Sequence, residues 1–164
     1  MMINHNSKNS KSKIAVFLDF DETLVTNRKE IELIENSLPS LLEKLNTQGV
    51  LLYITSRNPP YVVKRTLNEL ELSHFFVDII ADFRKKNYHV KEALFDLKTQ
   101  NITIDAIVFI DDFQENCRHV DNLKKEVKTP IYSIIYNKQP PYNLKTILSF
   151  ILENNFGEIR KLSI

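Results

Sequence analysis

The chain has 164 residues, of which 43% are hydrophobic and 26% are charged, and this balance predicts one globular domain with its own core. Its formal net charge of +1 argues against a strong electrostatic hold on nucleic acid or on an anionic membrane surface. The single cysteine, Cys117, excludes an internal disulfide. Because the sequence also shows neither a membrane span nor a signal peptide, a cytoplasmic protein is expected.

The two ends of the chain differ from its middle in composition. Residues 1–12 are rich in Asn, Ser and Lys, which predicts a disordered tail. A nucleic-acid-binding arm is the alternative, but scattered lysines are more typical of a solvated tail. A single domain is expected over residues 13–155, and a C-terminal tail over residues 156–164.

The stretch Ile14–Val25 begins as an uncharged run, Ile14–Leu18, and predicts a buried central strand. Side chains alternate along a strand, so Asp19, Asp21 and Thr23 are expected to begin on one side, with Phe20 on the other. Two carboxylates about 4 Å apart repel by roughly 4 kcal/mol even at an effective dielectric near 20, so a cation or a proton is expected between them. Ligands of open α/β sheets bind at the carboxyl ends of strands, and this strand end therefore predicts a binding site.

The rest of the chain alternates between helical and strand patterns. Leu24–Asn36 has no clean period and predicts a loop with a short turn or hairpin. Helices are predicted over Leu38–Gln48, Tyr61–Leu72, Val90–Thr99, Gln114–Lys125 and Leu144–Glu153, and strands over Val50–Thr55, Phe75–Ala81, Ala106–Ile110 and Ile131–Tyr136. This alternation predicts an α/β fold of three layers, Rossmann-like, with a mostly parallel central sheet and helices on both faces.

Polar residues follow two further strands. Thr55 and Ser56 end one of them, and a hydroxyl beside the N–H groups of the next helix could hold a phosphate oxygen or simply satisfy a turn. Asp111 and Asp112 follow another; Asp111 is expected to face the site, with Asp112 an outer ligand or a turn cap. Several carboxyl groups at one sheet edge suit Mg²⁺, which prefers hard oxygen ligands.

These motifs together resemble the haloacid dehalogenase (HAD) superfamily, most of whose members are Mg-dependent phosphatases. Asp19-Phe20-Asp21-Glu22-Thr23 matches the first motif, Thr55 (or Ser56) the second, and Asp111-Asp112 the fourth. The gaps between the motifs leave no room for an inserted cap domain, so the resemblance is to capless members. A departure is the shortage of glycine, with only two in the chain.

The third motif of that superfamily is a lysine before the acidic pair. The spacing falls on His89, which leaves Lys86 as the preferred residue and Lys85 and then Lys91 as alternatives. A solvated basic turn over residues 84–86 is the other interpretation, and His89 itself could supply the cation.

The resemblance implies roles for these residues. Asp19 would be the nucleophile that forms an aspartyl-phosphate, and Asp21 the general acid and base. Mg²⁺ would be held by Asp19, the backbone carbonyl of Asp21, and Asp111, with Asp112 in support. The phosphoryl oxygens would be bound by the remaining residues, Thr23, Thr55, Ser56 and Lys86.

The substrate would be a phosphorylated small molecule or macromolecule, and neither its identity nor the oligomeric state can be read from the sequence. The rival function is a catalytically idle HAD-like domain that binds a partner protein. A response-regulator receiver does not fit, because its adjacent acidic pair comes first and this chain has the pair last.

Overall fold

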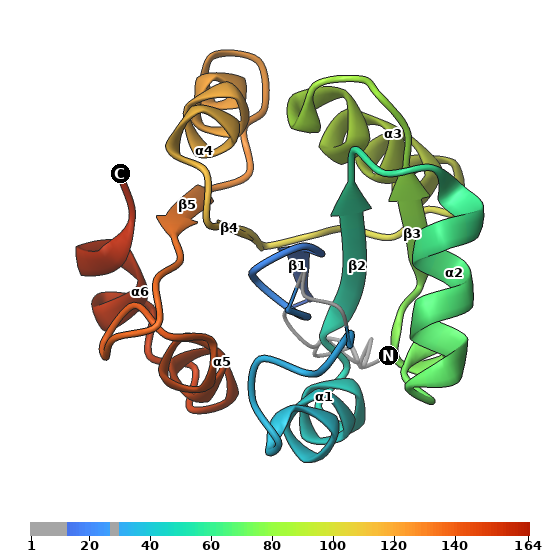
Figure 1. Ribbon diagram of the computed structural model, residues 1–164. Coiled ribbons are helices and arrows are strands. Elements are labelled where there is room, and N and C mark those ends of the chain that lie inside the picture. The colour runs from blue at the N-terminus through green and yellow to red at the C-terminus, as the bar shows by residue number, and fades with distance from the viewer. Residues whose placement is uncertain (1–12, 27–29) are drawn as a thin grey trace, which may run out of the picture.

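The computed structural model describes residues 13–26 and 30–164, so the tail predicted over residues 1–12 lies outside the described residues. Five strands form one sheet in the order β3-β2-β1-β4-β5, and every strand pair is parallel (Figure 1). Their bounds are β1 Ile14–Asp19, β2 Leu51–Ser56, β3 Asp78–Ala81, β4 Ala106–Asp111 and β5 Ile131–Ile135. This confirms the predicted α/β fold with a parallel sheet.

The central strand β1 is buried on both sides, as its uncharged sequence requires. Val16 and Leu18 belong to the hydrophobic cluster on one face of the sheet, and Ala15 and Phe17 to the cluster on the other. The Phe17 ring stacks on Tyr53 of β2 with 4.8 Å between ring centroids. Alternate side chains of β1 therefore pack into the two hydrophobic clusters on opposite faces of the sheet.

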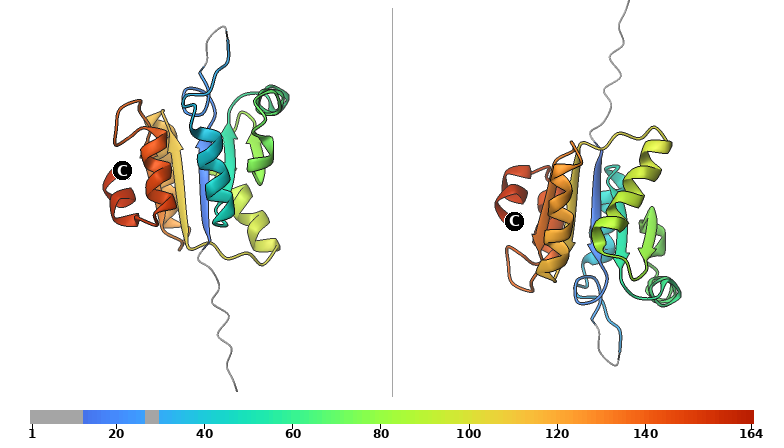
Figure 2. Two further views of the ribbon diagram at one scale, coloured as in Figure 1. Left: turned by 90° about the horizontal axis from the view of Figure 1, so that it is seen from below. Right: turned by 90° about the horizontal axis from the view of Figure 1, so that it is seen from above.

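Helices cover both faces of the sheet, giving the three predicted layers (Figures 1 and 2). One face packs against α1 (Leu38–Thr47), α2 (Pro60–Glu69), α5 (Leu144–Leu152) and α6 (Phe156–Leu162), and the other against α3 (Lys86–Thr99) and α4 (Gln114–Asp121). In α1, Leu38, Leu41, Leu42 and Leu45 make the buried stripe of an amphipathic helix. The positive φ of Gly49, +83°, suits the turn just after this helix.

The strand order sets where a ligand would bind. From β1 the chain proceeds to β2 and β3 on one side, and then crosses to β4 and β5 on the other. The sheet therefore changes winding direction between β1 and β4, and in open α/β sheets the crevice at this switch point, outside the carboxyl ends of the strands, is the usual ligand site.

The C-terminal tail predicted over residues 156–164 is instead the helix α6, so this prediction was wrong. Ile159 and Leu162 are buried in the core cluster, and the Asn155 side chain caps the helix by accepting a hydrogen bond from the Glu158 N–H. The Ile164 N–H donates to the carbonyl of Ser133 in β5. Two apolar side chains and this strand contact are sufficient to fold the last residues onto the domain.

Smaller differences concern where elements begin and end. Helix α3 begins at Lys86 rather than at Val90, and the helix predicted over Gln114–Lys125 is α4 followed by a 3₁₀ turn, η2 (Asn122–Lys125). A second 3₁₀ turn, η1 (Ser73–Phe75), precedes β3. Among the described residues, no helix is both long and apolar enough to cross a membrane.

The segment after β1 is a short hairpin beside the carboxyl edge of the sheet, as predicted (Figure 2). Val25 and Leu33 form an antiparallel bridge, and the Thr26 N–H donates to the carbonyl of Glu32 at 2.8 Å. Residues 27–29 lie outside the described part. Among the described residues, no connection between strands contains a second folded unit that could serve as a cap.

Candidate active site

Three carboxylates meet at the switch point of the sheet. Asp19 ends β1, Asp111 ends β4, and Asp112 follows directly; the register pairs Leu18 with Ile110, which brings the two strand ends level. One oxygen from each of the three lies within 4.8 Å of the others. Asp19 is 8% exposed and Asp111 is fully buried, whereas Asp112 is exposed. We call these three residues the acid cluster.

Lys86 supplies a buried cation to the acid cluster. Its Nζ lies 2.7 Å from Asp19 Oδ1 and 3.6 Å from Asp111 Oδ2, and its side chain is 1% exposed. The early start of α3 places Lys86 in the first turn of that helix, which follows the carboxyl end of β3. Lys85 is exposed, and Lys91 pairs with Glu126. Of the three candidate lysines, Lys86 is the one that the structure brings to Asp19.

The predicted hydroxyl residues lie around the same point. Thr55 is opposite Asp19 in the sheet register, and its Oγ1 is 3.4 Å from Lys86 Nζ, which also donates to the Thr55 carbonyl. Ser56 is buried, and its Oγ accepts a hydrogen bond from the Asn58 N–H at 3.1 Å. The Ser56 hydroxyl oxygen is thus engaged in the turn that follows β2.

Thr23 reaches Asp19 by a different route from the one predicted. Strand alternation does not continue past Asp19, because Glu22 adopts a positive φ of 56° and turns the chain back. The Thr23 Oγ1 then donates to Asp19 Oδ2 at 3.3 Å. A tight turn, rather than an extended strand, brings this hydroxyl to the carboxylate.

The side chain of Asp21 accepts a hydrogen bond from Asn58 Nδ2 and lies near enough to Asp19 and Lys86 to sense the charge of both. Burial raises the pKa of Asp21, and the nearby charge of Asp19 adds to this, although the Asn58 hydrogen bond acts in the opposite direction. A carboxyl with a raised pKa can hold a proton for a leaving group. Sequence reasoning missed Asn58, whose only signal is its place two residues after the hydroxyl pair.

Asp111 is held in place by two donors: the Phe113 N–H at 2.9 Å and the Asn116 Nδ2, which is 3.0 Å from Oδ2. Burial and the charge of Asp19 together raise the pKa of Asp111 to about 7, against the lowering effects of Lys86 and of the hydrogen bonds from Phe113 and Asn116. Without a metal ion the cluster therefore retains a proton near neutral pH. Asn116, in the first turn of α4, was also missed by sequence reasoning.

The raised pKa of Asp111 predicts a pH-dependent stability. A carboxyl that binds its proton more tightly in the folded state destabilises the protein as pH rises from about 4 to about 7, by up to roughly 4 kcal/mol in the metal-free protein. A divalent cation bound by the cluster would displace that proton, so we expect stabilisation by added Mg²⁺ to grow from pH 5 to pH 8. Thermal melting in EDTA and in Mg²⁺ at both pH values measures this.

Asp111→Asn is the variant that isolates this effect. It should raise the melting temperature in EDTA at pH 8, because one buried negative charge is removed, and it should abolish the stabilisation by Mg²⁺. A lower melting temperature in EDTA would contradict the assignment and would show that the Asp111 charge serves the fold alone.

His89 does not join the acid cluster. It is fully buried, and its Nε2 lies 2.9 Å from Asp82 Oδ1. Burial lowers the pKa of His89, which keeps the ring neutral near pH 7. Arg84, in the predicted basic turn, pairs with Asp82 and with Glu92. His89 and Arg84 thus stabilise the connection between β3 and α3 that carries Lys86.

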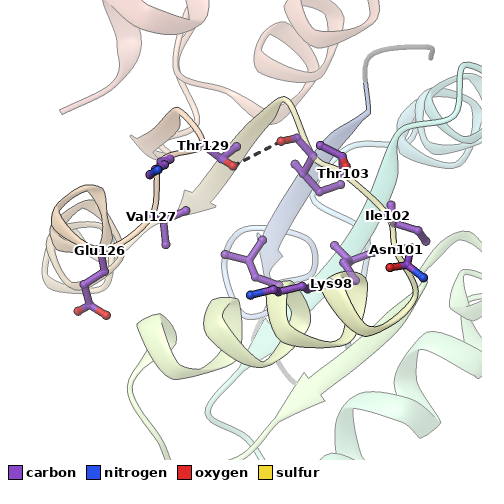
Figure 3. A pocket seen from close by; sticks show the side chains of 11 residues that line it. Lys98, Asn101, Ile102, Thr103, Glu126, Val127 and Thr129 are labelled. Carbon is purple, nitrogen blue, oxygen red and sulfur yellow. Dashed lines mark hydrogen bonds between the residues drawn. The ribbon is translucent and has the colours of Figure 1, made fainter. Parts of the chain in front are cut away.

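A cavity of about 740 Å³ lies at the opposite end of the sheet (Figure 3). It is lined by the end of α3, by the segment before β4 and by the segment before β5, including Lys98, Asn101, Thr103 and Thr129. None of the acid-cluster residues borders this cavity. The acid cluster and this cavity therefore lie at opposite ends of the strands.

A family model described as "Protein of unknown function (DUF705)" matches residues 1–156 of the chain. The chain belongs to the DUF705 family. A search of the curated proteins finds no match for this DUF705 protein.

Solved structures with a similar fold are HAD-like. A haloacid dehalogenase-like hydrolase from Streptococcus pneumoniae has a TM-score of 0.55 and 16% identity, covering 83% of this chain and 90% of its own. The core domain of a candidate phosphoglycolate phosphatase from the same species has a TM-score of 0.56 and 18% identity, covering 87% and 96%. The HAD domain of the Legionella pneumophila effector protein Lem4 has a TM-score of 0.57 and 16% identity, covering 93% and 96%. The DUF705 protein thus has a HAD-like fold.

Proposed function

We propose that this DUF705 protein is a Mg-dependent phosphatase that hydrolyses phosphate monoesters through an aspartyl-phosphate. The observation that carries the proposal is the acid cluster with Lys86 Nζ 2.7 Å from Asp19 Oδ1, at the switch point of the sheet. Similar folds described as a hydrolase and as a candidate phosphatase support the same reaction class. A cytoplasmic location is part of the proposal, since Cys117 is free and buried.

The cluster has the chemistry of a divalent cation site. Asp19, Asp111 and Asp112 offer hard carboxylate oxygens within 4.8 Å of one another, and Asp111 is costly to ionise while no cation is present. Mg²⁺ would be held by these residues together with the backbone carbonyl of Asp21. A bound Mg²⁺ supplies charge neutralisation on the transferring phosphoryl group.

The residues then have distinct tasks. One oxygen of Asp19 attacks phosphorus, the bond from phosphorus to the ester oxygen breaks, and Asp21 gives its proton to that leaving oxygen. Asp21 next takes a proton from water, whose oxygen attacks phosphorus and releases inorganic phosphate and free Asp19. Lys86 and the Thr55 hydroxyl neutralise and hold the phosphoryl oxygens. The buried position of Lys86 strengthens this interaction.

The test is release of inorganic phosphate from p-nitrophenyl phosphate and from small alkyl phosphates, in Mg²⁺ and in EDTA. We expect release that requires Mg²⁺, together with a Mg-induced rise in melting temperature. A rise in melting temperature without release from any ester would contradict the phosphatase and favour an idle domain that binds a partner. The presence of Lys86 beside Asp19 weakens that rival, because an idle domain has no need of a buried cation at the position of the third HAD motif.

A further inference from the structure

Most of the strongly exposed aromatic side chains belong to segments that follow the carboxyl ends of strands. Among the described residues, the aromatic side chains that are at least half exposed are Tyr61 (70%), Phe83 (77%), Tyr88 (50%), Phe95 (66%) and Phe113 (55%). All except Phe95 lie in the segments that follow β2, β3 and β4. Because the carboxyl ends of parallel strands share one edge of the sheet, these segments border the site (Figure 1).

The backbone around these rings is the backbone that positions the site. Three of these rings lie within three residues of a site residue: Tyr61 after Asn58, Phe83 before Lys86, and Phe113 after Asp111. Tyr88 is left out, because side chains two residues apart on a helix point to different sides and Lys86 of α3 points into the acid cluster. The Phe113 N–H itself donates to the Asp111 carboxylate. We call Tyr61, Phe83 and Phe113 the aromatic rim.

Two cationic side chains accompany the aromatic rim. Arg57 and Lys85 are both exposed, and they belong to the segments that follow β2 and β3. Neither forms an ion pair with another described residue. Flat apolar surfaces beside cations suit a ligand that combines an aromatic ring with a phosphate. The net charge of +1 does not suit a long polyanion, so a small ligand is favoured.

The rings are exposed to solvent, whereas the residues that would bind the phosphate are buried. Asp19 is 8% exposed and Lys86 1%, whereas the rings of the aromatic rim are at least half exposed. The rings therefore lie outside the position where phosphorus must meet Asp19. A substrate ring that stacks on them has to be joined to its phosphate through a spacer, as a base is joined through ribose. An aryl phosphate, with its phosphate directly on the ring, lacks that spacer.

We propose that the aromatic rim binds the base of a nucleoside monophosphate whose phosphate lies at the acid cluster. The proposal rests on the proposed function, which it deepens by naming the substrate class. Base stacking on exposed aromatic side chains tolerates any base, so the preference is for the ring and not for one nucleotide. Ribose 5-phosphate is the matched ligand, because it has the same sugar and phosphate without the base.

The experiment measures binding of AMP, UMP, ribose 5-phosphate and p-nitrophenyl phosphate to the Asp19→Asn protein in Mg²⁺, by calorimetry. We expect both nucleotides to bind at least tenfold more tightly than ribose 5-phosphate, in line with stacking of roughly 5- to 150-fold per base. The double variant Phe83→Ala/Phe113→Ala should remove most of that difference and leave ribose 5-phosphate unchanged within about twofold. Phe95→Ala, an equally exposed ring on α3, should change nothing.

Three results would overturn the inference: equal affinity for AMP and ribose 5-phosphate, loss of affinity for both ligands alike in the double variant, or p-nitrophenyl phosphate binding as tightly as AMP. These experiments also distinguish failure of the base site from failure of the proposed phosphatase function. If wild type releases phosphate from AMP and ribose 5-phosphate with equal kcat/KM, the phosphatase stands and the base site falls. If no ester is hydrolysed but the tenfold difference in binding persists, the base site stands and the phosphatase falls.

Discussion

Asp19→Asn is expected to lower phosphate release by roughly 10⁴-fold or more, since an amide cannot form the acyl-phosphate bond on which the proposed route depends. The variant should still fold, because Asn keeps the shape of the side chain and buried Lys86, which loses the Asp19 charge, keeps Asp111 Oδ2 at 3.6 Å as its partner. Initial rates in Mg²⁺ with p-nitrophenyl phosphate, measured beside wild type at equal protein concentration, give the ratio.

The matched control for this loss is Asp96→Asn. Asp96 is an exposed aspartate of α3 outside the acid cluster, and its replacement removes the same charge from the chain. Full activity in Asp96→Asn with none in Asp19→Asn assigns turnover to the cluster and excludes a contaminating phosphatase, which would survive in both preparations. Equal activity in wild type and Asp19→Asn would rule out Asp19 as the nucleophile.

Lys86→Met is expected to harm both stability and activity. Removing the ammonium leaves buried Asp19 and Asp111 without their cation, and breaking such a buried pair costs about 3 kcal/mol or more. In a chain of this length that corresponds to a fall in melting temperature of roughly 10 °C. The loss of one preorganised cation should also lower kcat by about 10²- to 10³-fold.

Added Mg²⁺ should have different effects on the stability and on the activity of Lys86→Met. Because the cation replaces part of the missing positive charge, Mg²⁺ should stabilise Lys86→Met by more degrees than it stabilises wild type, while the rate stays low. Lys91→Met is the control, since Lys91 pairs with Glu126 and takes no part in the cluster. A Lys86→Met protein that melts and turns over like wild type would contradict the role given to this lysine.

The fold could be predicted because its signals are local and agree with one another. Short uncharged runs rich in β-branched and aromatic residues, such as Ile14–Leu18 and Ile107–Ile110, are typical of strands buried on both faces, and the helical stripes between them favour parallel crossovers. The same runs end in Asp19 and Asp111, so strand polarity alone was enough to expect the two acids at one sheet edge.

The parts that could not be predicted depend on contacts distant in sequence. The residue before α3 is Lys85, which makes no side-chain cap, so no capping residue in the sequence marks the start of that helix. The contact that singles out Lys86 joins it to Asp19, 67 residues earlier in the chain. Asn58 and Asn116 are amides of a common kind in turns and first helical turns, and only the folded structure shows which carboxylates they contact. Helix α6 has only seven residues, and Asn154-Asn155 before it are residues typical of turns, so the sequence pattern there resembles the end of a folded domain.

Residues 163 and 164 also cover part of one edge of the sheet. Strand β5 is an outer strand of the sheet, and such strands expose unpaired backbone groups that can recruit another chain into aggregates. Ser163 bridges Ile134 in antiparallel fashion, and the Ile164 N–H occupies the Ser133 carbonyl. On the opposite side, β3 is only four residues long. One border of the sheet is thus covered in part by residues 163 and 164 and the other is short, so each leaves few free backbone groups for pairing with a further strand.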